Sequence, residues 1–284
     1  ATERYAYDVN KAGMITDAIW EDIDGDSKKD LITTSDWGPT TIYKNTGRNL
    51  SKRDTSLDDY HGWWKTVTAV DIDNDGDLDL VLGNQGSNTL YKATKDRPMK
   101  LWINDYDNNG TIEQICTTTI DGGDFPLHMK KELTNQIVSL KKQNLKASDY
   151  AKRTINELFS EKVINNTIVK QANTMESVIA INNGNGDFTV KELPPRTQLS
   201  SVNSLTLIDL NDDGYKDIIT GGNNFEFKPQ FSRLDANYGS VLLNDKNNNF
   251  EWQDYSETGF FIKNEVKHLS RYKSKTGKNY VIAV

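Results

Sequence analysis

Four acidic segments of nine residues constrain the fold of this chain more than any other feature. They read DIDGDSKKD at 22–30, DIDNDGDLD at 71–79, DYDNNGTIE at 105–113 and DLNDDGYKD at 209–217. Each carries Asp, Asn or Glu at positions one, three, five and nine, and the register never slips. Short apolar or β-branched runs flank each segment, which is typical of a tight loop between two half-buried strands. The sequence therefore predicts four strand-loop-strand hairpins built to one pattern.

Further short strands follow these hairpins. The runs TTIYKNTG, NTLYKAT, SVIAINNGNGDFTVKEL and GSVLLNDKNNNFEWQ complete units of about 40 to 50 residues with four strands each. Such repeats favour a β-propeller, although a sandwich is an alternative. We predict an all-β fold, a propeller of four-stranded antiparallel blades. The blades are expected at 14–57, at 62–97, at 98–120 joined with 176–193, and at 200–253, with a partial blade at 260–284.

The two ends of the chain and one long insertion depart from the repeat. Either residues 1–10 complete the last blade, or the chain is a piece of a longer protein; the strand tally favours the second. Residues 126–175 form the insertion, in which apolar residues are spaced three and four apart, as at Leu133, Ile137 and Leu140. This spacing predicts two amphipathic helices. We expect them to dock on the third blade rather than form a separate domain.

Composition limits the classes of function. The net charge of −7 and the pI near 5.1, without a basic cluster, argue against nucleic acid as the main partner. The mean hydropathy of −0.69 and the lack of a long apolar run argue against a transmembrane segment. Cys116, the single cysteine, cannot form an internal disulfide, and its alternating surroundings predict a strand.

The acidic loops predict bound calcium. Several carboxylates within nine residues repel one another unless a cation neutralises them, and calcium takes six to eight oxygen ligands. Side chains at positions one, three, five and nine and the backbone carbonyl at position seven would supply these oxygens, for up to four ions. The loops at 22–30 and 105–113 are expected to bind more weakly, because Ser27, Asn109 and Glu113 depart from the pattern. The predicted ligands are Asp22, Asp24, Asp26, Lys28, Asp30, Asp71, Asp73, Asp75, Asp77, Asp79, Asp105, Asp107, Asn109, Thr111, Glu113, Asp209, Asn211, Asp213, Tyr215 and Asp217.

Two other interpretations of the loops are weaker. An EF-hand needs a bidentate Glu at position twelve and flanking helices. Position twelve is instead Thr33, Leu82, Cys116 or Thr220, and the flanks are strands. Acidic surface turns without metal are the second alternative, which four loops in one register make less attractive.

These loops resemble the D-x-D-x-D-G-x-x-D loops of the FG-GAP and VCBS repeat family, which includes the integrin α-subunit propeller. More narrowly, GMITDAIWEDIDGD, HGWW, LGNQGSN, DFPLHMKKEL and RLDANYGSVLLND are similar to the carboxy-terminal part of large VCBS repeat proteins of Bacteroidota. The resemblance implies a calcium-binding propeller that is secreted or lies at the outer surface of the cell. Such proteins are expected beside outer-membrane uptake systems of the SusC and SusD type.

Catalytic motifs are not evident. The three histidines lie far apart, and neither a G-x-S-x-G elbow nor a phosphate-binding glycine loop occurs. We therefore expect a non-catalytic module that mediates adhesion or binds a protein or glycan at the cell surface. The alternative is a calcium-dependent polysaccharide lyase or glycoside-degrading enzyme, because some lyases are calcium-loaded propellers. The candidate ligand-binding residues are Trp37, Trp63, Trp64, Arg233 and Tyr238.

Overall fold

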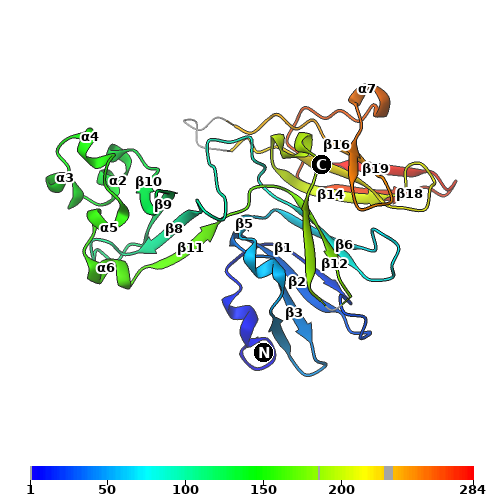
Figure 1. Cartoon of the computed structure of the whole chain (residues 1–284), viewed down its shortest axis with the longest axis horizontal. Coiled ribbons are helices and arrows are strands. Elements are labelled where there is room, and N and C mark those ends of the chain that lie inside the picture. Colours follow the sequence, from blue (N-terminus) through cyan, green and yellow to red (C-terminus); the bar gives the residue numbers. More distant parts are fainter. Residues whose placement is uncertain (1, 185, 227–232) are drawn as a thin grey trace. The chain divides into compact units, whose positions relative to one another are not determined.

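The computed structural model describes residues 2–184, 186–226 and 233–284, in two compact units. Unit 1 comprises residues 1–90 and 175–284, and unit 2 comprises residues 91–174, drawn mostly in green in Figure 1. Both contain antiparallel sheets, and the chain is mostly β, which is consistent with the all-β prediction, while unit 2 adds helices. The described residues form no closed ring of blades, so propeller closure and blade number stay predictions.

Unit 1 contains three sheets and a hairpin, all antiparallel. Sheet I has the strand order β1 (Met14–Glu21), β2 (Asp30–Gly38), β3 (Thr41–Asn45) and β4 (Leu50–Arg53), with β5 (Gly62–Trp63) paired to β2. Sheet II has the order β13 (Phe188–Glu192), β12 (Val178–Asn182), β7 (Asp79–Gly83) and β6 (Thr66–Val70). Sheet III has the order β14 (Val202–Ile208), β15 (Asp217–Gly222), β16 (Ser240–Asn244) and β17 (Phe250–Trp252). The last hairpin is β18 (Leu269–Lys273) with β19 (Asn279–Ala283).

The sheets of unit 1 pack face to face in series. Leu80 and Leu82 of β7 join a core with Ile32 and Ile42 of sheet I. Val81 points to the opposite face of β7 and joins a second core with residues of sheet III. Because both faces of sheet II are buried, β7 is a continuous apolar run rather than an alternating one. A third core lies between sheet III and the β18–β19 hairpin.

Two glycines allow close backbone approach: Gly83 between sheets II and III, and Gly222 within sheet III, where β15 faces the start of β14. A Cβ on Gly83 would lie 2.4 Å from the carbonyl oxygen of Val202. A Cβ on Gly222 would lie 1.6 Å from the carbonyl oxygen of Ser201. Neither glycine has a positive φ, so their role is close packing rather than turn formation.

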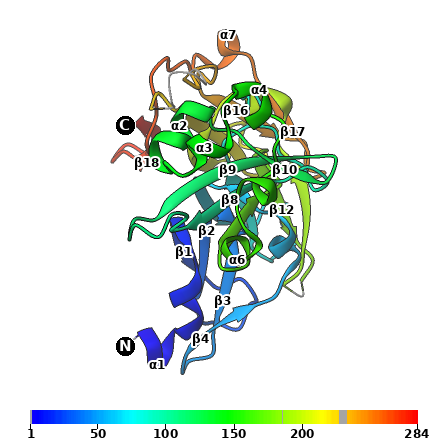
Figure 2. The same cartoon turned by 90° about the vertical axis from the view of Figure 1, so that its left-hand side faces the viewer.

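Unit 2 combines one sheet with short helices. The sheet has the order β10 (Gly123–Pro126), β9 (Glu113–Ile120), β8 (Met99–Asn104) and β11 (Ile168–Ala172). The helices are α2 (Lys130–Gln136), α3 (Leu140–Gln143), α4 (Ala147–Tyr150), α5 (Ile155–Leu158) and α6 (Glu161–Asn165). Figure 2 shows them beside this sheet, and Trp102 and Ile115 of the sheet share a core with Leu133, Ile137 and Leu140.

The insertion was placed incorrectly in the sequence prediction. Strands at 98–120 do not pair with 176–193; instead Val178–Ala180 of β12 pairs with Leu80–Leu82 of β7. The physical reason is that β6 and β7 alone leave an unpaired apolar edge, which β12 completes after the chain returns from unit 2. Residues 88–94 form no strand, and five short helices replace the two that were expected at 126–175. These helices share one compact unit with the sheet that contains the strands at 98–120.

The amino terminus also differs from the prediction. Residues 1–10 were a candidate strand for the last blade, but α1 (Thr2–Tyr5) and the 3₁₀ helix η1 (Tyr7–Lys11) are helical. The backbone N–H of Lys52 in β4 donates to the Asp8 carboxylate at 3.0 Å, which ties η1 to sheet I. The remaining helical turns are η2 (Ser56–Asp59), η3 (Pro195–Leu199) and α7 (Tyr255–Thr258).

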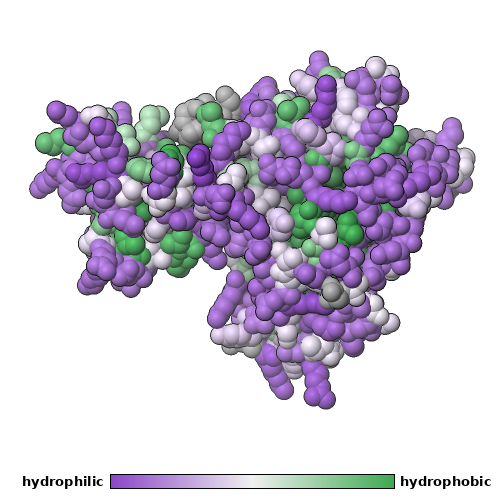
Figure 3. Space-filling model, viewed as in Figure 1, coloured by the Kyte–Doolittle hydropathy of each residue, from purple (hydrophilic) through white to green (hydrophobic). Residues whose placement is uncertain are grey.

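The surface is mainly polar. Figure 3 shows hydrophilic side chains over most of the face drawn, with apolar groups in small separate areas. Among the residues that the structure describes, no helix is both long and apolar enough to cross a membrane.

Candidate metal-binding loops

Each acidic segment is the loop of an antiparallel hairpin, as predicted. The loops join β1 to β2, β6 to β7, β8 to β9 and β14 to β15. Three of them lie in unit 1 and contact one another's hairpins; for example, Asn74 donates to the carbonyl of Gly214 at 3.3 Å. The loop at 105–113 belongs to unit 2.

Three of the loops share one hydrogen-bond pattern, which the loop at 22–30 keeps only in part, since its Asp26 N–H donates to Asp24. In the loop at 71–79, the two carboxylate oxygens of Asp71 accept the backbone N–H groups of Asp75 and Gly76, both at 3.1 Å. Asp105 and Asp209 accept the equivalent pairs in their own loops. Asp75 then accepts the N–H of Asp77 at 2.9 Å. Such side-chain to backbone bonds hold a short polar loop in one conformation without help from a regular sheet.

The turns explain where glycine is needed. Position four is left-handed in every loop, at Gly25, Asn74, Asn108 and Asp212. Position six is left-handed as well, and it is Gly in three loops but Ser27, with a φ of 65°, in the first. Because Gly, Asn and Asp tolerate this conformation best, the loop at 22–30 is the least regular of the four.

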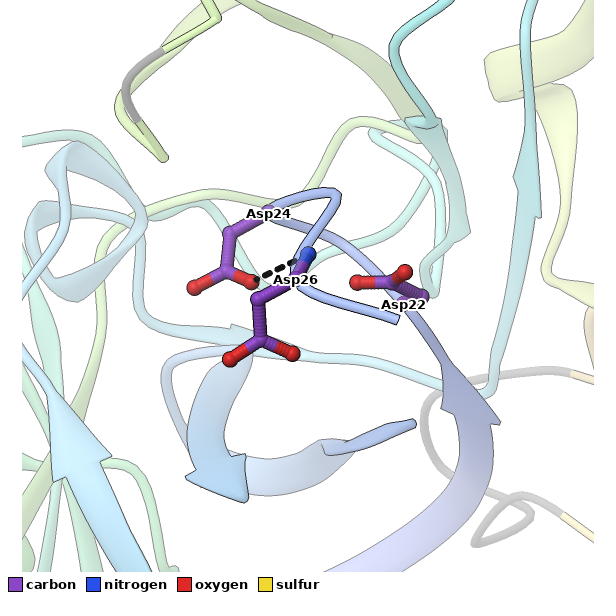
Figure 4. A group of neighbouring side chains, drawn as sticks. All are labelled: Asp22, Asp24 and Asp26. Atoms are coloured by element: carbon purple, nitrogen blue, oxygen red, sulfur yellow. Dashed lines mark hydrogen bonds between the residues drawn. The ribbon is translucent and has the colours of Figure 1, made fainter. Parts of the chain in front are cut away.

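Three of the loops gather carboxylates tightly enough to hold a cation. Ligand oxygens of each group lie within 4.8 Å of one another, and the groups are Asp22, Asp24 and Asp26; Asp71, Asp73 and Asp79; and Asp105, Asp107 and Glu113. In the first group, the carboxylates of Asp24 and Asp26 project to the same side of the loop (Figure 4). The fourth loop, where Asn211 occupies position three, forms no such group of acids among the described side chains.

Buried oxygens without partners test whether calcium fits. One oxygen each of Asp22, Asp73 and Asp107 is buried and accepts no hydrogen bond. These atoms lie at positions one and three, where metal ligands were predicted. A buried acceptor without a partner is costly, and a hard cation satisfies it. The all-oxygen donor sets of the loops at 71–79 and 105–113 therefore fit calcium, whereas basic side chains already contact two acids of the loop at 22–30.

The acid at position nine has a structural role that the sequence prediction missed. Asp79 is 1% exposed, and its two oxygens accept the backbone N–H groups of Ile72 and Asn182 at 2.9 and 2.8 Å. Asp217 bonds the N–H groups of Leu210 and Asn244 in the same way. Burial raises the pKa of Asp79 to about 6, because the charged form is desolvated. Position nine thus fastens the loop to the third strand, and metal coordination by its carboxylate stays a prediction.

An asparagine at the end of the third strand joins neighbouring sheets. The Asn182 amide donates to the carbonyls of Ile23 and Leu78, in the loops of sheets I and II, at 3.0 and 3.1 Å. The Asn244 amide bridges the loops of sheets II and III through the carbonyls of Ile72 and Lys216. The repeated endings YKN, AIN and LLN were a sequence signal for this position.

The loops differ in the cations around them. Lys44, Arg53 and Lys28 contact the acids of the loop at 22–30. Lys246 lies 3.3 Å from Asp213 in the loop at 209–217. Within the described part of the chain, no Lys or Arg lies at ion-pair distance from the acids of the loops at 71–79 and 105–113.

The candidate ligand-binding residues do not converge on one site. Trp64 is fully buried and Trp63 is 8% exposed, so neither offers a ligand a free surface. Trp37 is half-buried, with a left-handed φ of 59°, and its ring packs edge-on against Trp63 at 4.9 Å. Arg233 stacks over Phe225 at 4.6 Å, while Tyr238 stacks on Phe261 at 4.7 Å.

One comparison with known proteins bears on these loops. Residues 22–82 match the family model described as an FG-GAP-like repeat. The matched stretch begins at Asp22 and ends in β7, so it contains the first two acidic loops and all of sheet I from β2 onward. The match supports the FG-GAP repeat family for this part of the chain. No curated protein matches the chain significantly.

Proposed function

We propose that this chain is a non-catalytic binding module of propeller-type blades whose acidic loops bind calcium. The FG-GAP-like repeat at 22–82 supports a module of this class. The observation that carries the calcium part is the loop at 71–79, where Asp71, Asp73 and Asp79 converge and one Asp73 oxygen is buried without a partner.

Electrostatics explains why this loop needs a cation. Five aspartates lie between residues 71 and 79, and no Lys or Arg among the described residues lies at ion-pair distance from them. Two like charges 4 Å apart repel by about 4 kcal/mol at an effective dielectric constant of 20. Calcium held by Asp71, Asp73 and Asp75 would remove this repulsion. The ion would then stabilise the hairpin that β6 and β7 form, and serve the scaffold rather than a reaction.

Thermal unfolding with and without calcium tests the proposal. A ligand that binds only the folded state stabilises it by about 2.7 kcal/mol at a hundred times its Kd. We expect calcium to raise the Tm of the EDTA-treated protein, and Asp73→Asn to lose a large part of that increase. Asp77→Asn is the matched control, because among the described residues the Asp77 carboxylate accepts no hydrogen bond, and only the Asp77 carbonyl is a predicted ligand. Equal Tm values in calcium and EDTA would contradict the proposal.

We also propose that the module lies at an extracellular or outer-membrane surface and binds a protein or glycan there, with SusC- and SusD-type proteins as candidate partners. The FG-GAP-like repeat supports protein binding in general terms. Weak calcium sites of extracellular modules are filled at the calcium concentrations outside cells. Digestion of intact cells with an added protease tests the location, since an internal protein would survive it.

A further inference from the structure

Three basic side chains of the protein itself contact the acids of the loop at 22–30. Lys44 of β3 contacts the Asp24 carboxylate and lies 3.5 Å from Asp26. Arg53 of β4 lies 3.3 Å from Asp24, and Lys28 lies 3.1 Å from Asp26. The Asp24 side chain is only 11% exposed, so solvent screens its two ion pairs less than it screens a surface pair.

The charges in this loop nearly balance without a metal. Asp22, Asp24, Asp26 and Asp30 carry up to four negative charges, and the three basic side chains offset three of them. A calcium ion would add two positive charges to this nearly balanced cluster and would have to displace the Lys44 ammonium group from Asp24. The loop at 71–79 offers calcium the opposite situation, because no Lys or Arg of the described residues forms an ion pair with its acids.

The strand register of the sheets shows which basic side chain of sheet I has no counterpart in sheets II and III. Asn45, Asn182 and Asn244 occupy matched positions, since each donates its backbone N–H to the ninth acid of its own loop. The residue before each asparagine is Lys44 in sheet I but Ile181 in sheet II and Leu243 in sheet III. Arg53 is less distinctive, because its matched residue in sheet II, three pairs from the asparagine, is Lys191. Lys44 therefore distinguishes the first repeat.

We propose that the loop at 22–30 is a metal-independent copy of the repeat, in which Lys44 and Arg53 replace calcium. Sheet I then keeps its loop ordered when calcium is absent, while the loops at 71–79 and 105–113 depend on the ion. The second half of this inference rests on the proposed function, and the first half does not.

Hydrogen exchange of the whole chain in calcium and in EDTA tests the contrast between loops. We expect amides at 71–79 and 105–113 to exchange at least about tenfold faster in EDTA, and amides at 22–30 to exchange at the same rate in both. Equal acceleration at 22–30 and 71–79 overturns the inference while the proposed function stands.

Lys44→Ile tests the role of the lysine, because Ile is the residue at the matched position of sheet II. In EDTA the variant should have a Tm lower by about 2 to 6 °C, and added calcium should restore it. Lys29→Ile is the matched control, because Lys29 pairs with Glu21 and not with the acids of the loop. If Lys44→Ile does not fold, Lys44→Gln removes the charge and keeps a polar side chain.

The two experiments separate failure of the inference from failure of the proposed function. If no segment responds to calcium, the proposed function is wrong. Even in that case, a lower Tm of Lys44→Ile than of Lys29→Ile in EDTA would support the proposal that basic side chains neutralise the acids of the loop at 22–30. Equal Tm values for the two variants in EDTA overturn it.

Discussion

Asp79 links the order of an acidic loop to the pairing of strands. It is buried, and it bonds one backbone amide in its own loop and one at the end of β12. A single carboxylate therefore fixes both the loop conformation and the register of the strand that returns from unit 2. The neighbouring charges of Asp73 and Asp75 add to the effect of burial and raise its pKa further.

The raised pKa of Asp79 predicts a pH dependence in the absence of calcium. The folded-state pKa of about 6 lies above the ordinary value of 3.8, so the folded state binds the proton more tightly. The resulting stability is present below about pH 4 and is lost as the pH rises through 6, by at most about 3 kcal/mol. Urea unfolding in EDTA at pH 4 to 7 should show this loss, and Asp79→Asn should show less of it.

Calcium should reverse that trend, because a bound cation favours the ionised carboxylate and lowers its pKa. Asp77→Asn serves as the control and should keep the pH dependence of the unaltered protein. If Asp79→Asn and Asp77→Asn have the same pH profile in EDTA, Asp79 is not the titrating group.

Asn182 gives a second prediction at the residue scale. Its buried amide joins sheets I and II through the carbonyls of Ile23 and Leu78. Asn182→Ala leaves two carbonyls without a donor and should lower the free energy of unfolding by about 2 to 3 kcal/mol. Asn183→Ala, at the exposed next position, should change it by less than about 0.5 kcal/mol, as measured by chemical denaturation. Similar losses in both variants would show that the bridge contributes little.

At the scale of elements, the sequence predicted local structure better than strand partnership. The repeated spacing of the acidic residues predicted each hairpin correctly, because a hairpin is specified by apolar alternation and turn residues that lie within about a dozen positions of one another. The pairing of β12 with β7 joins residues about a hundred positions apart, and no local pattern encodes it. Lys44 was missed for a similar reason, since a lysine in a strand shows its carboxylate partner only after folding.

Within sheet III, the close approach of β15 to the residue before β14 predicts a large effect of one methyl group. In Gly222→Ala the added Cβ would meet the carbonyl of Ser201 at 1.6 Å, so the backbone must shift. Overpacking of this kind costs about 3 kcal/mol or more, and the Tm should fall accordingly. Gly38→Ala is the control, because its Cβ meets the Ser35 side chain and no backbone atom, and the Ser35 hydroxyl can rotate away from its bond to the Pro39 carbonyl. If the two variants lose equal stability, the backbone contact is not limiting.

At the scale of the whole molecule, the two units have separate cores. Among residues 2–184, 186–226 and 233–284, the clusters that join sheets I, II and III contain no residue of 91–174, and the core of unit 2 contains no residue outside it. The insertion leaves and re-enters unit 1 at neighbouring points, since Gly86 N–H donates to the Met175 carbonyl at 2.8 Å. This hydrogen bond lies within unit 1 and joins the segment that leads into unit 2 to the segment that returns from it.

Excision of unit 2 should therefore leave unit 1 folded. When a short Gly-Ser linker replaces residues 91–174, we expect one cooperative thermal transition and retained calcium dependence from the loop at 71–79. Calcium titration by calorimetry should lose only the contribution of the loop at 105–113. The matched variant Asp105→Asn in the full chain should remove the same contribution without excision. An excised protein that exposes apolar surface, or unfolds without a cooperative transition, would show that unit 1 depends on unit 2 for folding.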